Sequence, residues 1–178
     1  MKKISARGIA YIAAAAALMT VCSWLTVPFA VPFTMQTFAV SCSLVMLGGR
    51  KGTAATVLHI LMGLAGLPVF SGFRGGAGHL LGPTGGYIAG FILTGLCWLI
   101  FENRLKGKKA AAKYAVLLLG LALCYLAGTL WFAAVYARRG SAMSFVSALS
   151  VCVAPYVLPD LAKLALALYI GERVRKIL

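Results

Sequence analysis

Two charged side chains stand inside the last apolar stretch of the sequence. In APYVLPDLAKLALALYIG, Asp160 precedes Lys163 by three residues, so a helix would place both on one face. A charge at the centre of a membrane helix costs about 2.5 to 3.5 kcal/mol, which makes such residues rare unless they have a function. The ammonium would attract a carboxylate, and the carboxylate would accept hydrogen bonds from amide-like or urea-like N–H groups. The pair predicts a site for a small anion with a polar head or, alternatively, an internal ion pair that fixes helix packing.

The rest of the chain offers few other reactive groups. The two remaining acidic residues, Glu102 and Glu172, fall beside basic residues at the ends of apolar runs. Five cysteines stand singly and lack the close pairing of a zinc or redox site, so we expect neither a metal nor a cofactor. The sequence contains no G-x-x-x-x-G-K-[ST] phosphate loop. Proton-transfer chemistry needs at least two positioned titratable groups, and we therefore expect no enzyme.

The composition places these residues in a membrane. Of 178 residues, 62% are hydrophobic and 11% are charged, with a mean hydropathy of +0.95. At about 20 residues per crossing, the length allows six helices and leaves no room for a soluble domain. We expect an all-α fold, with six transmembrane helices in a single integral membrane substrate-binding domain over residues 1–178. The apolar runs lie near 8–27, 36–49, 53–69, 85–101, 114–135 and 154–171.

The distribution of Lys and Arg predicts the orientation. Thirteen of them fall on the side of the N-terminus, while the opposite side has only Arg74, Arg138 and Arg139. Because positive residues are retained in the cytoplasm, both termini should be cytoplasmic. The formal charge of +14 then indicates topology in a lipid bilayer and no nucleic-acid partner.

This orientation makes three segments external. They are TVPFAVPFTMQ, VFSGFRGGAGHLLGPTGG and YARRGSAMSFVSALSVCVA, and all three are long and poor in charge. A loop in water is normally polar, so these segments are expected to fold back over the bundle and line a cavity. Interfacial anchoring or core packing is expected of the aromatic residues Trp24, Trp98, Trp131, Tyr125 and Tyr136.

Three motifs resemble the BioY family of biotin transporters: VPFTMQTFAV, GLAGLPVFSGFRGGAGHLLGPTGGYIAGF and LPDLAKLALA. The resemblance spans most of the chain. It implies a six-helix S component of an energy-coupling factor (ECF) importer in the bacterial cell membrane. Such a subunit binds biotin outside with high affinity and needs a transmembrane scaffold subunit and two ATPases. An S component for another small vitamin, and facilitated diffusion of biotin by a homo-oligomer, remain alternatives.

The resemblance also implies which residues bind the substrate. Asp160 and Lys163 correspond to residues that the family places against biotin. Two external segments would supply the lid and pocket wall, although a lone His in a loop is often only a structural hydrogen-bonding group. The wall residues implied are Phe33, Thr34, Gln36, His79, Gly82, Thr84 and Tyr87.

Small residues recur at four-residue spacing in the first apolar run, at Ala6, Ala10 and Ala14. Such a stripe permits close contact between helices. It is suited to packing within the bundle, whereas the family resemblance suggests that it docks the scaffold subunit.

Overall fold

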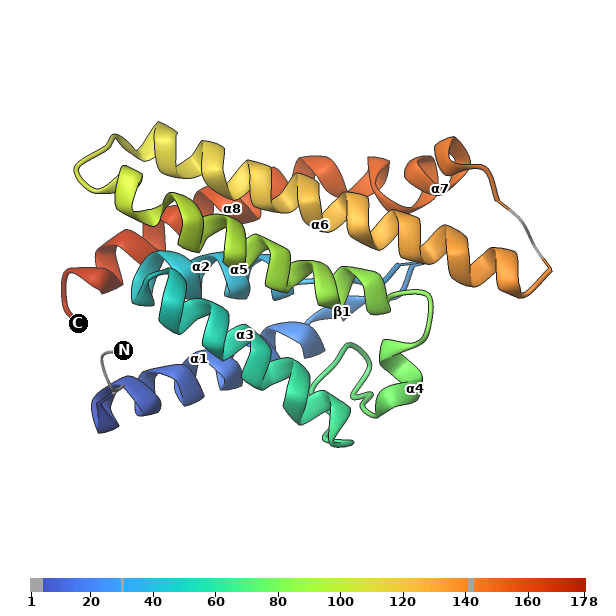
Figure 1. Ribbon diagram of the computed structural model, residues 1–178, viewed down its shortest axis with the longest axis horizontal. Coiled ribbons are helices and arrows are strands. Elements are labelled where there is room, and N and C mark those ends of the chain that lie inside the picture. The colour runs from blue at the N-terminus through green and yellow to red at the C-terminus, as the bar shows by residue number, and fades with distance from the viewer. Residues whose placement is uncertain (1–4, 30, 141–142) are drawn as a thin grey trace.

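The computed structural model describes residues 5–29, 31–140 and 143–178 and shows a bundle of long helices (Figure 1). Short elements join these helices at one end of the bundle. In chain order the elements are α1 (Ala6–Trp24), β1 (Thr26–Val27), β2 (Phe33–Thr34), α2 (Gln36–Leu47), α3 (Gly49–Leu64), α4 (Ala77–Leu80), α5 (Gly85–Leu105), α6 (Ala110–Arg138), α7 (Phe145–Cys152) and α8 (Ala154–Arg175).

Each of the six apolar runs coincides with a helix, but the helices differ in length. Within the described residues, α1, α5 and α6 are long and apolar enough to cross a membrane. The pair α7 and α8, bent by 48° at its junction, makes a fourth candidate. Helices α2 and α3 have 12 and 16 residues, which is short for a bilayer core about 30 Å thick. The chain is therefore a helical, multi-pass membrane protein.

Helix ends form where the sequence supplies caps and turns. The Ser5 side chain accepts a hydrogen bond from the Gly8 N–H and begins α1. Between α2 and α3 the chain reverses at Gly48, whose φ of 82° suits a residue without a side chain. The Glu102 carboxylate on α5 accepts the N–H of Gly49 at 2.9 Å. A partly buried carboxylate contact thus fixes this tight turn.

The helices pack in pairs, with α5 along α6, α2 along α8 and α1 along α3. Glycine allows the closest of these approaches. A Cβ atom at Gly90 of α5 would lie 2.8 Å from Cys124 Sγ, and one at Gly120 of α6 would lie 2.8 Å from Thr94 Cγ2. The outward face of α6 exposes Leu119, Leu123, Leu126 and Leu130. That face suits contact with lipid.

The two ends of the bundle differ. Figure 1 shows the start of α1, the α2–α3 turn, the α5–α6 connection and the C-terminus together at one end. The hairpin of β1 and β2, α4 and α7 lie toward the opposite end. In the hairpin Thr26 pairs with Thr34 and Val27 with Phe33, in antiparallel register. All three segments expected to be external therefore gather at one end.

Candidate ligand-binding site

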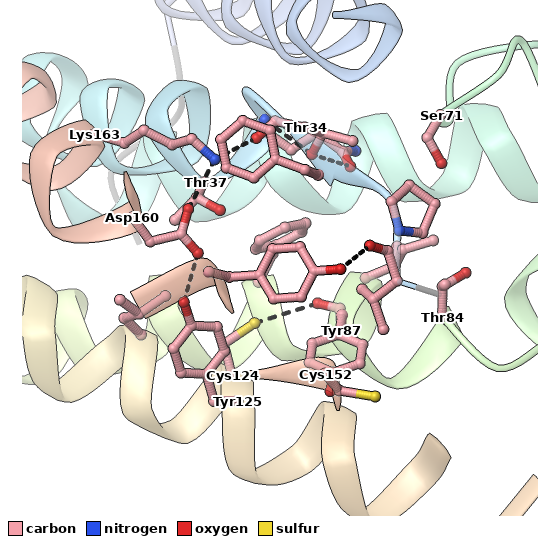
Figure 2. Close-up of a pocket in the computed structure, with 18 residues that line it drawn as sticks. Thr34, Thr37, Ser71, Thr84, Tyr87, Cys124, Tyr125, Cys152, Asp160 and Lys163 are labelled. Atoms are coloured by element: carbon pink, nitrogen blue, oxygen red, sulfur yellow. Dashed lines mark hydrogen bonds and ion pairs between the residues drawn. The ribbon is translucent and has the colours of Figure 1, made fainter. Parts of the chain in front are cut away.

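A narrow cavity of about 70 Å³ lies among β2, α2, α5, α6 and α8. Most of its wall is aromatic or aliphatic, and a few polar groups face inward, as is typical of small-molecule sites. We call it the ligand pocket (Figure 2). Its lining residues are Val31, Pro32, Phe33, Thr34, Gln36, Thr37, Ser71, Thr84, Tyr87, Ile88, Phe91, Leu121, Cys124, Tyr125, Cys152, Tyr156, Asp160 and Lys163.

The polar centre of the pocket is the ion pair between Asp160 and Lys163. Lys163 Nζ lies 2.8 Å from Asp160 Oδ1, and each side chain is only 7% exposed. The ammonium also donates to the Thr34 carbonyl at 2.7 Å and lies 3.5 Å from the centre of the Phe33 ring. The second carboxylate oxygen, Oδ2, accepts the Tyr125 hydroxyl at 2.6 Å. Both charges are fully partnered, and their sum is zero.

The helix that carries this pair begins where the sequence permits it. Pro155 stands in the first turn of α8, where its missing N–H costs no helical hydrogen bond. Pro159 lies inside the same helix and removes one hydrogen bond just before Asp160. The three-residue spacing then turns Asp160 and Lys163 to the same side, as the sequence predicted.

A series of hydrogen-bonded, buried polar side chains holds Gln36 at the start of α2. Gln36 is 5% exposed, and its Nε2 lies 3.2 Å from His59 Nε2 on α3. The other ring nitrogen, His59 Nδ1, lies 3.2 Å from Thr20 Oγ1 on α1. Three helices therefore support one amide in the pocket wall. His59 holds this amide from outside the pocket and does not line it.

The wall on the side of α5 is also fixed by hydrogen bonds. The Tyr87 hydroxyl lies 3.0 Å from Thr129 Oγ1 on α6. Near the opening, the Tyr156 hydroxyl of α8 donates to the Val31 carbonyl. Phe33 stacks on Tyr156 with 6.3 Å between ring centres. These contacts fix the rings of Phe33 and Tyr156 in the pocket wall.

Seven of the nine substrate-binding residues predicted from the sequence line this pocket, while His79 and Gly82 do not. The latter two line a second, wider cavity next to it. The His79 ring stacks on Phe70 with 5.3 Å between centres. The Gly82 carbonyl accepts the Trp131 indole N–H at 2.9 Å, so Trp131 anchors the glycine-rich segment.

Tyr125 is the important wall residue that sequence analysis did not select. In the sequence it is one of several aromatic residues in apolar runs, for which interfacial anchoring or core packing is expected. Its partner Asp160 is 35 residues away on another helix. Only the packing of α6 against α8 brings the two together.

Tyr125→Phe should destabilise the protein by about 1.5–3 kcal/mol, because it removes one hydrogen bond to a buried charged group while keeping the ring. Thermal unfolding of the purified protein in detergent measures this. The matched control is Tyr136→Phe, since the described residues contain no hydrogen-bond partner for the Tyr136 hydroxyl. Equal melting temperatures for Tyr125→Phe and the unaltered protein would contradict the assigned contact.

Comparison with known proteins assigns this chain to a family. The model of the BioY family matches residues 1–178. The chain belongs to the BioY family. The biotin transporter BioY of Thermotoga maritima is 38% identical over 163 residues, covering 90% of this chain and 91% of the relative. The probable biotin transporter BioY of Pyrococcus horikoshii is 33% identical over 173 residues, covering 97% and 98%.

A solved structure shares the fold of this BioY family member. The S component for biotin from an ECF-type ABC transporter superposes with a TM-score of 0.83 at 24% identity. The match covers 96% of this chain and 91% of that chain. The bundle therefore has the S-component fold.

Proposed function

We propose that the chain binds biotin from outside the cell with high affinity and delivers it across the membrane as the S component of an ECF-type importer. Family membership and the biotin transporters among its relatives support this. The names of those relatives also agree with the expectation of a transporter and no enzyme. The observation that carries the proposal is the buried ion pair in a mainly apolar pocket.

The geometry of the pair suits the urea group of biotin. That group presents N–H donors and a carbonyl acceptor side by side. An Asp160 oxygen and the Lys163 ammonium, 2.8 Å apart, offer the matching acceptor and donor. The Phe91 and Leu121 side chains supply apolar surface for the sulfur-containing ring. Binding then exchanges part of the internal ion pair for contacts with the ligand.

The proposed topology has six membrane crossings with both termini in the cytoplasm of a bacterial cell. Its support is the separation of the two ends of the bundle. Most Lys and Arg residues of the described chain belong to segments at the end that holds the start of α1 and the C-terminus, while residues of the β1–β2 hairpin at the other end line the pocket. The short helices α2 and α3 pack against longer neighbours, which shields their ends from lipid. All 178 residues then form one integral membrane domain.

We further propose that a transmembrane scaffold subunit and two ATPases supply the energy, because the sequence contains no phosphate loop. The stripe of small residues on α1 supports a docking face for the scaffold. Ala6, Ala10 and Ala14 are exposed, whereas Ala15 and Ala16 of the same helix are 3% and 1% exposed. The exposed alanines therefore do not pack inside the bundle, and a second helix can approach them closely.

Equilibrium binding of labelled biotin to the detergent-purified chain tests the proposal. The expected result is saturable binding that unlabelled biotin displaces and that thiamine and riboflavin leave unchanged. Displacement by another vitamin, or no saturable binding by folded protein, would refute it. Uptake assays in cells that make this chain alone separate the importer from facilitated diffusion, since a diffusion pathway would work without the ATPases.

A further inference from the structure

A second cavity of about 750 Å³ adjoins the ligand pocket at the outer end of the bundle. It lies between the β1–β2 hairpin loop and the glycine-rich segment around α4. Pro32, Ser71 and Thr84 line both cavities. We call this outer cavity the vestibule, because a ligand in the pocket can extend past these shared residues into it.

The vestibule has an unbalanced positive charge. Arg74 and Arg139 line it, and both are exposed. The whole chain has only three acidic side chains, and none of them lines the vestibule. Asp160 pairs with Lys163, Glu172 pairs with Lys113, and Glu102 accepts the Gly49 N–H. The two guanidinium groups therefore remain available to an anion that comes from outside the protein.

Two polar atoms at the vestibule also lack partners. Thr26 Oγ1 and His79 Nε2 are buried and make no hydrogen bond within the described residues. Burial, together with the nearby positive charge of Arg74, lowers the pKa of His79 and so favours the neutral form of its ring. A threonine hydroxyl can donate to a carboxylate oxygen, and so can a neutral histidine through its N–H. Unpartnered buried groups of this kind favour a ligand that satisfies them.

The ligand pocket itself offers no surplus cation for a carboxylate. Its only charged side chains are Asp160 and Lys163, which cancel each other. Figure 2 shows this pair at one side of the pocket and Ser71 and Thr84 at the opposite side, where the vestibule begins. In biotin the urea ring and the carboxylate stand at opposite ends of a methylene chain. A ring held by the pair therefore directs the carboxylate toward the vestibule.

We infer that the vestibule is a separate subsite in which Arg74 and Arg139 bind the carboxylate of the ligand, while the Asp160–Lys163 pair binds its ring. The inference rests on the proposed function and divides recognition between two sites. It assigns Lys163 to the urea carbonyl, although the sequence alone had suggested that this ammonium attracts the carboxylate. The arginines then determine specificity for the charged form of the ligand.

Binding of biotin and of uncharged biotin amide tests the inference by isothermal titration calorimetry. The unaltered chain should prefer biotin by about tenfold or more, because only the acid gains charge-assisted hydrogen bonds. In the double variant Arg74→Gln, Arg139→Gln, biotin should bind about tenfold more weakly and the amide as before, so that the preference disappears. The fold tolerates the change at Arg74, since only its main-chain carbonyl forms the bridge to Phe70.

Arg138→Gln is the matched control, because Arg138 is exposed, precedes Arg139 and lines neither cavity. It should keep the full preference for biotin. The inference is overturned if the double variant still prefers biotin as strongly as the unaltered chain, if both ligands weaken equally, or if the unaltered chain shows no preference. Failure of the unaltered chain to bind either ligand would instead refute the proposed function.

Discussion

Lys163→Met should weaken biotin binding by about a hundredfold or more and also destabilise the chain. The substitution removes the proposed donor to the ligand and leaves the Asp160 carboxylate buried with Tyr125 as its remaining partner. Breaking a buried pair from one side costs about 3–5 kcal/mol, because the other charge loses its compensation. Calorimetric titration with biotin and thermal unfolding in detergent measure the two effects.

The double variant Asp160→Asn, Lys163→Met separates the effect on biotin binding from the effect on stability. It removes both charges, so its stability should return close to that of the unaltered chain while biotin binding stays lost. Lys113→Met is the control, since the Lys113–Glu172 pair is 23% and 34% exposed and contributes less than about 1 kcal/mol. A folded double variant that still holds biotin as tightly as the unaltered chain would exclude the ion pair from recognition.

Ala10→Trp combined with Ala14→Trp should reduce biotin uptake by cells at least about tenfold and leave biotin binding to the purified chain unchanged. Both alanines are exposed on α1, and an indole there holds an approaching helix away. Uptake of labelled biotin is measured in cells that also make the scaffold and ATPase subunits, and co-purification of the scaffold reports assembly.

The matched control for α1 is Ala122→Trp, an exposed alanine on α6 among the exposed leucines of that helix. It should leave uptake intact. Normal uptake by the α1 variant would show that the scaffold docks on another face. Loss of biotin binding by that variant would instead show that these alanines support the bundle itself.

The sequence predicted the long elements well because their signal is local. Continuous apolar runs mark helices directly, as for α1 and α6. The short elements at the end of the bundle that holds the hairpin were not predicted. The hairpin, α4 and α7 are short and pack against the long helices of the bundle. The periodic pattern of so few residues does not predict such contacts.

The site was predictable to a similar extent. Asp160 and Lys163 are conspicuous because charge is rare in apolar runs, and their three-residue spacing fixes their shared face. Tyr125 was missed because its hydroxyl donates to a carboxylate on another helix, and the local sequence does not predict that contact. His79 and Gly82 belong to the same segment as Thr84, yet the turns around α4 place them in the vestibule. Their spatial separation depends on loop conformation.

The zero net charge of the Asp160–Lys163 pair has an electrical consequence for transport. The pair supplies no mobile counterion, and Arg74 and Arg139 stay with the chain, so each delivery of an anionic vitamin by the proposed importer would move one negative charge inward. A membrane potential that is negative inside opposes this by about 2.3 kcal/mol for every 100 mV. ATP hydrolysis by the proposed ATPase subunits would then have to overcome the voltage as well as the concentration gradient.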